Sequence, residues 1–465
     1  MAGRLPGDLM VSVSGFRGKV GSCLTPELIA SLAAAFGAFL RGDGAVGPVC
    51  LGRDSRTSGR MLSDAARSGL VSVGVDVVDL GIVPTPTVLL SAEKGSCAGA
   101  LVVTASHNPA EWNALKFAGS DGTFLDAPRM ERFQQFLETD FNRADWDGLG
   151  SSRGDSGAIE RHIEHILQLP ILEVDRIRNH RFHVAVDCVH GAGGLMVPAL
   201  LEALGCQVAG IGLDPDGRFP RDPEPTAGNL SRLGGLVRDC GADLGFAVDP
   251  DVDRLSLVDR KGVPLGEDLT LALCAATVLR REESPVVTNL STSRVVEDVA
   301  RSASVSLLRS PVGEVNVARR MTEVGASIGG EGNGGVILSD LHLTRDAPVA
   351  CALVLQHLLD AGTGLREAAD RWPSYSIVKE KVQFPIERIG EACAALVEKY
   401  PAAERNSEDG LRLDWDSERE WLHVRPSGTE PVVRLIAEAS TEARAREIVG
   451  QARELLSHHA VGSQE

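Results

Sequence analysis

One arrangement of apolar and small residues occurs three times along the chain and constrains its fold more than any other feature. An apolar run ends in a turn of small residues and continues as a helical pattern at residues 48–70, 182–205 and 285–303. A second short apolar run follows at residues 75–88, 206–214 and 304–315. Strand, helix and strand in this order predict right-handed βαβ units with parallel sheets. We therefore expect an α/β fold.

The chain from residue 372 onward follows a different pattern. Short strand-like runs stand between helical patterns at residues 386–400 and 441–456, which indicates a small α+β domain with an antiparallel sheet. Polar, glycine-rich stretches at residues 148–157 and 258–268 separate the repeated units, which favours separate domains over one large doubly wound sheet. We expect four domains, at residues 1–150, 151–257, 258–371 and 372–465.

Charge and composition narrow the class of partner. The formal net charge of −17 argues against nucleic acid or a membrane as a partner, because acidic surfaces would repel this chain. No apolar run reaches the roughly 18 residues of a membrane-spanning helix, and the N-terminus lacks the pattern of a secretory signal. The nine cysteines show no C-x-x-C spacing, as expected for small buried side chains in a reducing compartment. We expect a cytoplasmic protein.

Three aspartates alternate at Asp249, Asp251 and Asp253, directly after the apolar run LGFAV. Alternate side chains of an extended segment point to the same side, so these carboxylates can converge on one hard cation. An EF-hand is excluded because Arg254 and Arg260 stand where that loop needs a glycine and its final glutamate. An acidic turn and an aspartyl nucleophile are the alternatives to the metal site that we predict.

Ser106 stands beside His107 in the stretch VTASHNPA, where another apolar run ends. A Ser–His hydrolase is disfavoured, because adjacent residues of an extended strand point apart and the G-x-S-x-G elbow is missing. A helix cap would use only the hydroxyl. The hypothesis that joins this serine to the aspartates is a phosphorylated serine beside a divalent metal.

Two further loops combine glycine with polar side chains. GGEGNGGV surrounds Glu331 and Asn333 with glycines, which is typical either of a flexible loop or of a backbone that approaches a polyhydroxyl ligand closely. RPSGTEPVVRL supplies a cation, hydroxyls and exposed backbone N–H groups, which predicts either an ordinary hairpin turn or a cradle for a phosphate monoester. SGFRGKVG presents Arg17 between glycines in a similar way.

The stretches TASHNPAEWNALKF, DPDVDRL, GEGNGG and RPSGTEP occur in this order over nearly the whole chain. Their combination resembles the α-D-phosphohexomutase family, which includes phosphoglucomutase, phosphomannomutase and phosphoglucosamine mutase. GRDSRTSG, VPTPTV, PEPTAGNL and VDCVHGAGG are also similar to the family. The resemblance implies three mixed α/β domains and a smaller C-terminal α+β domain around a central cleft.

The resemblance also implies a role for each loop. The implied catalytic residues are Ser106 as the phosphoserine, Lys116 in proton transfer, Arg17, His107 and Arg254. The implied ligands of Mg²⁺ are Asp249, Asp251, Asp253 and phosphorylated Ser106. The implied sugar-binding residues are Gly330, Glu331 and Asn333. The implied phosphate-binding residues are Arg425, Ser427, Gly428, Thr429 and Arg434.

The implied reaction interconverts hexose 1-phosphate and hexose 6-phosphate. The phosphoserine passes its phosphoryl group to a sugar phosphate, the bound hexose 1,6-bisphosphate reorients, and its other phosphoryl group returns to the serine. Mg²⁺ and the bisphosphate are the expected cofactors. A small-molecule sugar phosphate is the expected partner of a monomer or homodimer, without nucleic acid or membrane.

Four positions depart from the family pattern. Ala114 replaces a glycine, Asn333 a serine and Gly335 a histidine of bacterial relatives, and Glu314 stands where some members have a histidine. These positions read the sugar, so they leave its identity open; the WNALK loop favours glucosamine phosphate over glucose or mannose phosphate. A sugar-phosphate phosphatase and a non-catalytic sugar-phosphate sensor are alternatives of a different class.

Overall fold

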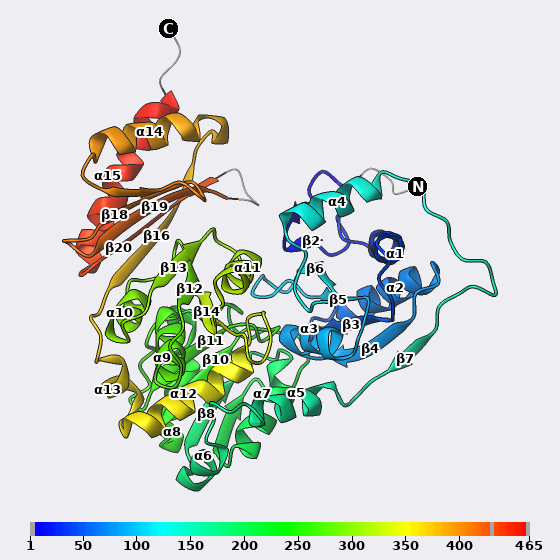
Figure 1. The fold of residues 1–465 in the computed structure, drawn as a ribbon, viewed down its shortest axis with the longest axis horizontal. Helices are drawn as coiled ribbons and strands as arrows, with labels where there is room; N and C mark the ends of the chain where they lie inside the picture. The colour runs from blue at the N-terminus through cyan, green and yellow to red at the C-terminus, as the bar shows by residue number, and fades with distance from the viewer. Residues whose placement is uncertain (1–4, 428–431, 462–465) are drawn as a thin grey trace.

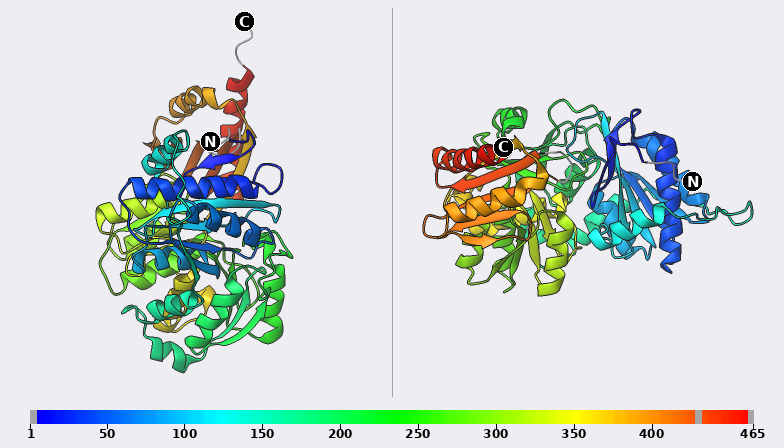
Figure 2. Two further views of the ribbon diagram at one scale, coloured as in Figure 1. Left: turned by 90° about the vertical axis from the view of Figure 1, so that its right-hand side faces the viewer. Right: turned by 90° about the horizontal axis from the view of Figure 1, so that it is seen from above.

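The computed structural model describes residues 5–427 and 432–461 of the chain, which contain four β-sheets with flanking helices (Figure 1). Figure 1 shows the first sheet at the right and the C-terminal sheet at the upper left, with the third sheet beneath the C-terminal sheet and the second sheet at the bottom; Figure 2 gives two further views. No helix of the described residues combines the length and the apolar character that crossing a membrane requires. The α/β fold class is confirmed.

The first sheet contains seven strands in the order β1-β2-β6-β5-β3-β4-β7. They are β1 (Met10–Ser12), β2 (Gly15–Lys19), β3 (Val49–Arg53), β4 (Val77–Ile82), β5 (Gly99–Val103), β6 (Trp112–Gly119) and β7 (Ser152–Gly154). The helices are α1 (Pro26–Gly42), α2 (Gly59–Val71), α3 (Thr85–Lys94) and α4 (Ala127–Leu137). The Thr25 hydroxyl caps α1 by accepting from the Leu28 N–H, and Pro26 suits the first turn. Phe36 of α1 packs edge-on against Phe117 and Phe133 in the core.

The second sheet has the order β11-β10-β8-β9. Its strands are β8 (His183–Asp187), β9 (Gln207–Ile211), β10 (Leu244–Val248) and β11 (Leu255–Asp259). Its helices are α5 (Ala158–Leu167), α6 (Val174–His180), α7 (Gly193–Ala203), η1 (Ala227–Asn229) and α8 (Ser231–Cys240).

The third sheet has the order β13-β12-β14-β15. Its strands are β12 (Val286–Asn289), β13 (Leu307–Ser310), β14 (Ile328–Glu331) and β15 (Gly335–Leu338). Its helices are α9 (Asp268–Leu279), α10 (Val295–Ser302), α11 (Glu314–Val324), α12 (Ala347–Ala361) and α13 (Leu365–Ala369). Helices α9 and α12 are buried along most of their length, so they form the core shared by the second and third sheets.

The three repeated units share one topology. In each, the first strand lies between the second and third and pairs with both in parallel, which confirms the βαβ prediction. Each unit also has a fourth strand, β6, β11 or β15, that returns antiparallel beside the third. The sequence analysis did not include this hairpin. A hairpin needs only a short loop between its strands, so the third and fourth strands follow one another closely.

The C-terminal sheet is entirely antiparallel, in the order β16-β20-β19-β18-β17. Its strands are β16 (Ser376–Gln383), β17 (Glu404–Asn406), β18 (Leu411–Trp415), β19 (Glu420–Pro426) and β20 (Val432–Ala439). Its helices are η2 (Ile386–Arg388), α14 (Ile389–Lys399) and α15 (Glu442–Val461). The predicted small α+β arrangement is therefore present. Strand β7 lies beyond residue 150, the expected end of the first domain, but it pairs with β4 in the first sheet. The last residues of β11 lie beyond residue 257, the expected end of the second domain, but they pair with β10 in the second sheet.

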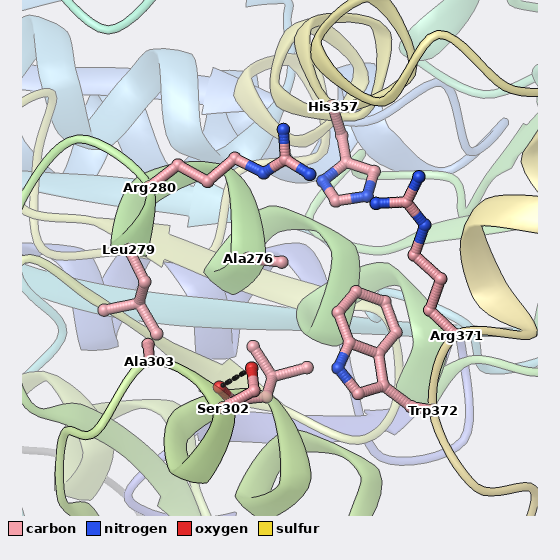
Figure 3. A pocket seen from close by; sticks show the side chains of 9 residues that line it. Ala276, Leu279, Arg280, Ser302, Ala303, His357, Arg371 and Trp372 are labelled. Atoms are coloured by element: carbon pink, nitrogen blue, oxygen red, sulfur yellow. Dashed lines mark hydrogen bonds between the residues drawn. The ribbon is translucent and has the colours of Figure 1, made fainter.

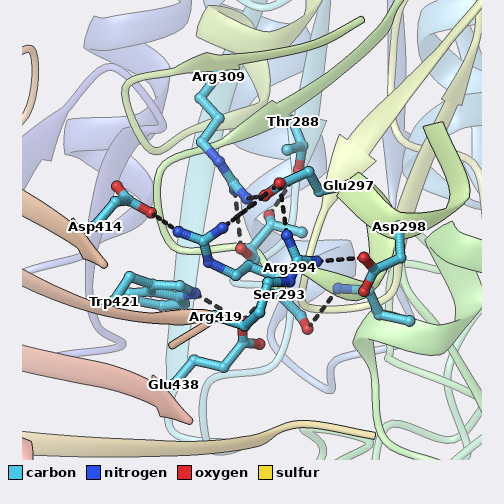
Figure 4. Close-up of polar contacts among 12 residues, drawn as sticks. Thr288, Ser293, Arg294, Glu297, Asp298, Arg309, Asp414, Arg419, Trp421 and Glu438 are labelled. Atoms are coloured by element: carbon cyan, nitrogen blue, oxygen red, sulfur yellow. Dashed lines mark hydrogen bonds and ion pairs between the residues drawn. The ribbon is translucent and has the colours of Figure 1, made fainter. Parts of the chain in front are cut away.

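A buried ion-pair network joins the third sheet's helix α10 to the C-terminal sheet (Figure 4). Arg294 pairs with Asp414 at 2.8 Å and with Asp416 at 2.8 Å, and its own backbone N–H donates to Glu438. Trp421 donates to the same Glu438 through its indole N–H at 2.8 Å. Arg294 is buried and also pairs with Glu297 of α10, so its contacts with Asp414, Asp416 and Glu438 connect α10 to the C-terminal sheet.

A second buried cluster lies where the three repeated units meet. Asp346 accepts from the Val349 N–H at the start of α12, and its other oxygen lies 2.8 Å from Nε2 of both His162 and His342. Thr87 of α3 contacts the other ring nitrogen of His162 at 2.9 Å. Burial acts against the charge, but the two histidines hold the pKa of Asp346 below its ordinary value. One carboxylate thus ties together residues of all three units.

Candidate active site

The predicted loops of the three α/β units occupy equivalent positions. Each is the turn between the third and fourth strand: β5–β6 carries Ser106, β10–β11 carries the aspartates, and β14–β15 carries the glycine-rich stretch. The predicted phosphate cradle begins at Arg425 of β19 and ends at Arg434 of β20, the antiparallel neighbour of β19. Hereafter these turns are the serine, aspartate, glycine and phosphate hairpins.

Arg56 hydrogen-bonds to the backbone of the serine hairpin. Its guanidinium donates to the backbone carbonyls of Ser106 at 2.5 Å and Asn108 at 2.6 Å, and also to those of Pro109 and Trp112. The buried Asp54 pairs with Arg56 at 3.0 Å and keeps the guanidinium oriented. Four carbonyls on one buried cation fix the loop before any ligand arrives. The prediction named the stretch GRDSRTSG without this role for Arg56.

Ser106 adopts a left-handed backbone conformation, with φ of 50°. This conformation brings its hydroxyl within 3.3 Å of Nδ1 of His107. The expectation that the two side chains point apart was therefore wrong, because it assumed an extended backbone. The same hydroxyl donates to Asp249 at 2.9 Å, so the serine and aspartate hairpins meet at this oxygen.

The aspartate hairpin is a tight turn and not the extended segment that the sequence argument assumed. Asp249 accepts from the backbone N–H groups of Asp253 and Arg254, and Val252 has a left-handed φ of 63°. The turn itself makes the carboxylates converge. Oxygens of Asp249, Asp251 and Asp253 lie within 4.8 Å of one another.

The aspartate cluster fits a divalent cation. Its donors are hard carboxylate oxygens, the class that Mg²⁺ and Ca²⁺ prefer. Among the described residues, Oδ1 of Asp251 and Oδ1 of Asp253 are buried without a hydrogen-bond partner. Buried carboxylate oxygens with free lone pairs are costly unless a cation or a hydrogen bond satisfies them. The structure therefore supports the predicted ligand set.

The carboxyl groups of Asp249 and Asp251 differ in how readily they ionise. Burial and the neighbouring Asp253 and Asp251 raise the pKa of Asp249 well above its ordinary value. Burial opposes ionisation of Asp251 too, but Lys116 at 3.1 Å and Thr85 at 2.8 Å hold the pKa of Asp251 below its ordinary value. Lys116 thus balances one carboxylate, and a cation would balance the others.

Three further predicted residues surround the serine. Arg17 donates to the Asn108 side chain at 2.6 Å, and burial lowers the pKa of Arg17. Arg254 pairs with Glu224 at 3.1 Å. Burial, with Arg254 and Arg17 nearby, lowers the pKa of His107 well below its ordinary value. His107 is therefore neutral near pH 7, with Nδ1 facing the serine oxygen.

The glycine hairpin holds a fully engaged carboxylate. Oε1 of Glu331 accepts from the Asn289 side chain at 2.7 Å and the Gly313 N–H at 3.0 Å, while Oε2 pairs with Arg345 at 2.6 Å. Burial opposes ionisation, but Arg345 and Asn289 hold the pKa of Glu331 below its ordinary value. Gly330 has φ of 153°, and a Cβ there would lie 2.1 Å from the Gly335 carbonyl oxygen.

Asn333 closes the glycine hairpin. Its side-chain oxygen accepts from the Gly335 N–H at 3.1 Å, and its amide nitrogen lies 3.4 Å from Oε2 of Glu331. Arg345, which the sequence analysis did not single out, also forms a short ion pair with Asp253. The aspartate and glycine hairpins are therefore joined by one guanidinium.

The phosphate hairpin has a row of cations. Arg425 of β19 lies directly opposite Arg434 of β20, which lies opposite Lys381 of β16. Like charges at directly opposed positions destabilise a sheet unless anions lie near them, and Asp409 already pairs with Arg425 at 3.0 Å. The row brings cationic side chains to the predicted phosphate site. Of the other predicted cradle residues, Ser427 follows β19 and is buried, whereas Gly428 and Thr429 lie outside the described residues.

Asp409 connects the phosphate hairpin to the glycine hairpin. It pairs with Nε of Arg425 at 3.0 Å and accepts from the Val312 N–H at 3.0 Å. The next residue, Gly313, donates to Glu331. An unbroken set of contacts therefore runs from the serine through the aspartates and Arg345 to Glu331 and Arg425.

A separate pocket of about 380 Å³ lies at the ends of α9 and α12. Arg280, Arg371, His357 and Trp372 line it, and the three polar side chains point toward one another in Figure 3. Burial and the two arginines lower the pKa of His357 to about 4. Within the described ranges, none of the predicted site residues lines this pocket.

The chain matches all four domain families of phosphoglucomutase/phosphomannomutase. The matches to α/β/α domains I, II and III cover residues 9–143, 160–262 and 266–375, and the match to the C-terminal domain covers residues 378–455. Each domain match contains one of the four hairpins.

Curated relatives align over nearly the whole chain. A probable phosphoglucosamine mutase of Methanopyrus kandleri is 38% identical over 441 residues, which are 94% of this chain and 95% of the relative. A phosphoglucomutase/phosphomannomutase of Thermococcus kodakarensis is 38% identical over 439 residues, 93% of this chain and 95% of the relative.

A solved structure agrees with these alignments. The crystal structure of a phosphoglucomutase/phosphomannomutase family protein from Burkholderia thailandensis superposes with a TM-score of 0.84 at 27% identity, covering 98% of this chain and 99% of that one. Four domain matches, near-complete relatives and a common fold agree. The chain belongs to the phosphoglucomutase/phosphomannomutase family of phosphohexomutases.

Proposed function

We propose that this chain interconverts hexose 1-phosphate and hexose 6-phosphate through a phosphorylated Ser106. The observation that carries the proposal is the 2.9 Å contact between the Ser106 hydroxyl and Asp249, within a buried cluster whose other carboxylates have free oxygens. A serine used only as a cap would have no need of a cation site at its oxygen.

Asp249, Asp251 and Asp253 would hold Mg²⁺ together with a phosphate oxygen on Ser106. When bound, the cation neutralises negative charge on the transferred phosphoryl group. Lys116 and Arg254 flank the same carboxylates, so the phosphoserine would sit among cations from two hairpins. The acidic net charge of the chain makes this local concentration of positive charge necessary for an anionic substrate.

In the first half-reaction, the bond between the Ser106 oxygen and phosphorus breaks as a sugar hydroxyl bonds to phosphorus. The hydroxyl proton leaves to a base, a transfer that contributes about 10²- to 10⁴-fold. Neutral His107, at 3.3 Å from the serine oxygen, and Lys116, held by Asp251, are the candidate proton carriers. Arg17 orients the loop through Asn108.

In the second half-reaction, the sugar bisphosphate has turned end for end, and its other phosphoryl group passes to Ser106. One site can serve both directions because the phosphate hairpin binds whichever phosphate is not transferred. Arg425, Ser427 and Arg434 would supply that cradle with Gly428 and Thr429, while Gly330, Glu331 and Asn333 would contact the sugar. Hexose 1,6-bisphosphate would therefore be both intermediate and activator.

Glucosamine phosphate is the first substrate to test, because the M. kandleri relative is named a probable phosphoglucosamine mutase. Glucose and mannose phosphates are the alternative, after the name of the T. kodakarensis relative. A cytoplasmic location, a monomeric or homodimeric state and the expected domain limits remain predictions.

A turnover panel tests the proposal. Purified protein with Mg²⁺ and a trace of hexose 1,6-bisphosphate is offered glucosamine, glucose, mannose and N-acetylglucosamine phosphates, with Ser106→Ala as the matched variant. We expect isomerisation that disappears in Ser106→Ala. Release of inorganic phosphate without isomerisation would instead identify a phosphatase. If protein phosphorylated on Ser106 shows no isomerisation and no phosphate release, the result would favour a non-catalytic sugar-phosphate sensor.

A further inference from the structure

Arg345 lies between the aspartate and glycine hairpins and contacts three carboxylates. One terminal nitrogen forms a short ion pair with Asp253, the other pairs with Glu331 at 2.6 Å, and Nε lies 3.4 Å from Glu314. The residue is almost completely buried. The nitrogens of a guanidinium are fixed in one plane, so this group sets the spacing of the carboxylates it binds.

The backbone around Arg345 is held on both sides. Its N–H donates to Glu314 at 2.8 Å, and the N–H of the following Asp346 donates to the Val336 carbonyl at 2.8 Å. Asp346 is also the carboxylate bound by the two histidines at the junction of the three units. The direction of the Arg345 side chain is therefore fixed by the fold and does not depend on its carboxylate partners alone.

The stem of Arg345 runs through space that Gly335 leaves open. A Cβ at residue 335 would lie 2.3 Å from Cδ of Arg345 and 3.0 Å from Cγ. Contacts that short require the stem to move. The backbone of Gly335 lies outside the left-handed positive-φ region, so an alanine there is not strained by its backbone. Its Cβ would conflict mainly with the Arg345 stem and would also lie 3.1 Å from Oδ1 of Asn333.

We propose that Arg345 is a positioning residue of this active site, and that Gly335 is the residue that admits it. Arg345 holds Glu331 at a fixed spacing from Asp253, and because it binds Oδ2 of Asp253 it would leave Oδ1 available to a cation. The inference rests on the proposed function for the roles of these two hairpins.

Arg345→Lys is the decisive variant, because lysine keeps the positive charge and loses the planar pair of donors. We expect its dissociation constant for Mn²⁺, measured without substrate by calorimetry, to rise about 10- to 100-fold, the usual cost of losing a partner of a metal ligand. We expect KM for the hexose phosphate to rise with it. Arg366→Lys is the matched control, since Arg366 pairs with Asp259 at a more exposed site.

A double-mutant cycle tests the role of Gly335. Gly335→Ala alone should weaken Mn²⁺ binding as Arg345→Lys does, because the displaced stem moves the guanidinium. In an Arg345→Ala background the same substitution should have almost no further effect. Thermal melting of each variant identifies any that fail to fold. If the Arg345 variants fail to fold, the Mn²⁺ affinity of Gly335→Ala alone decides the role of Arg345.

Two results would overturn the inference. The first is an Arg345→Lys variant whose Mn²⁺ affinity and KM both stay within about twofold of the unmutated chain, or a Gly335→Ala variant whose Mn²⁺ affinity does so. A change of about twofold is below the range expected when a metal ligand loses its partner. The other is a Gly335→Ala effect that is equal in both backgrounds. If the unmutated protein isomerises no sugar phosphate, the proposed function fails while the Mn²⁺ measurements still decide the role of Arg345.

Discussion

The aspartate and glycine hairpins have the same position in their units and opposite hydrogen-bond states. In the aspartate hairpin, one buried oxygen of Asp251 and one of Asp253 lack hydrogen-bond partners within the described part of the chain. In the glycine hairpin, both oxygens of Glu331 are engaged by Asn289, Gly313 and Arg345. Both hairpins bury acidic side chains beside cations.

The comparison shows that the aspartate hairpin has oxygens available to a ligand, whereas the carboxylate of the glycine hairpin is already fully hydrogen-bonded by the protein. The aspartate hairpin can still accept a cation, because two of its buried oxygens have no hydrogen bond within the described residues and Oδ1 of Asp253 has only a 3.7 Å contact with Arg254. In the glycine hairpin both oxygens of Glu331 already have partners, so in the proposed function a sugar hydroxyl would share or replace one of the donors to Glu331. The stability and activity that depend on the aspartate hairpin should therefore change strongly with metal, whereas those that depend on the glycine hairpin should change with its protein partners.

The largest effect is expected from Asp251→Asn. It removes a cation ligand and leaves Lys116 without its carboxylate at 3.1 Å. Turnover should fall about 10²- to 10³-fold, the range for losing one electrostatic contact to a transferring group. Steady-state rates at saturating Mg²⁺ measure it, and the exposed Asp64→Asn serves as the control. Turnover within a few fold of the unmutated enzyme would contradict a cation site at the aspartates.

Mg²⁺ itself should raise the thermal stability of the protein. A ligand at 100 times its dissociation constant stabilises the folded state by about 2.7 kcal/mol. We expect melting curves of the unmutated protein and of Glu331→Gln to shift upward with Mg²⁺, and the curve of Asp251→Asn to stay in place. A Mg²⁺-dependent shift of equal size in Asp251→Asn would remove the distinction between the two hairpins.

Glu331→Gln should destabilise the protein with or without metal. A glutamine offers one acceptor oxygen and places an amide against the donors that surround Glu331, so a buried donor loses its partner. The expected loss is about 1–3 kcal/mol in the free energy of unfolding. Urea denaturation in the presence and absence of Mg²⁺ measures it, and an unchanged midpoint would show that Glu331 is less engaged than described.

The smallest effect concerns Asp268, whose Oδ1 lies against the glycine hairpin at Gly332 and accepts from the Ser293 N–H. Burial, partly offset by Lys379, raises the pKa of Asp268 to about 7. The folded state therefore holds this proton more tightly than the unfolded chain, where an aspartate has a pKa of about 3.9. The resulting stabilisation is complete below about pH 4 and is lost as the pH rises toward 7.

The measurement for Asp268 is urea denaturation against pH. Between about pH 4.5 and 7.5, the unmutated protein should lose about 1 kcal/mol of stability relative to Asp268→Asn, a value reduced for the partial exposure of Asp268. A difference between the two proteins that stays constant with pH would show that Asp268 titrates normally.

The sequence predicted the repeated βαβ units because their apolar periodicity is local. It did not predict the antiparallel fourth strands, since β6, β11 and β15 are short apolar runs whose direction depends on their neighbour in the sheet. The aspartates were predicted from their alternating spacing and Ser106 from its place at the end of an apolar run, and their roles remain predictions. The extended backbone assumed for both was wrong, because each lies in a turn with a left-handed residue.

Arg345 was missed because its importance arises from contacts between hairpins that are distant in sequence. The partners Asp253 and Glu331 lie in different sheets, and no local pattern marks Arg345 as their link. One signal was present: Gly335 departs from the family pattern by losing a side chain, and lost volume in a packed site has to be filled. The His162–His342–Asp346 cluster was missed for the same reason.

The common hairpin position has a consequence for how such an enzyme can change. In the proposed function, the phosphoryl carrier, the cation ligands and the sugar contacts would each come from a separate copy of one structural element, whose flanking strands pair in their own sheet. An exchange of one hairpin for that of a relative would keep the strand pairing within each sheet, but it would have to preserve the contacts between hairpins, from Ser106 to Asp249, from Lys116 to Asp251 and from Arg345 to Asp253 and Glu331. Substitutions in one hairpin of such an enzyme should therefore be accompanied by compensating substitutions in its neighbour.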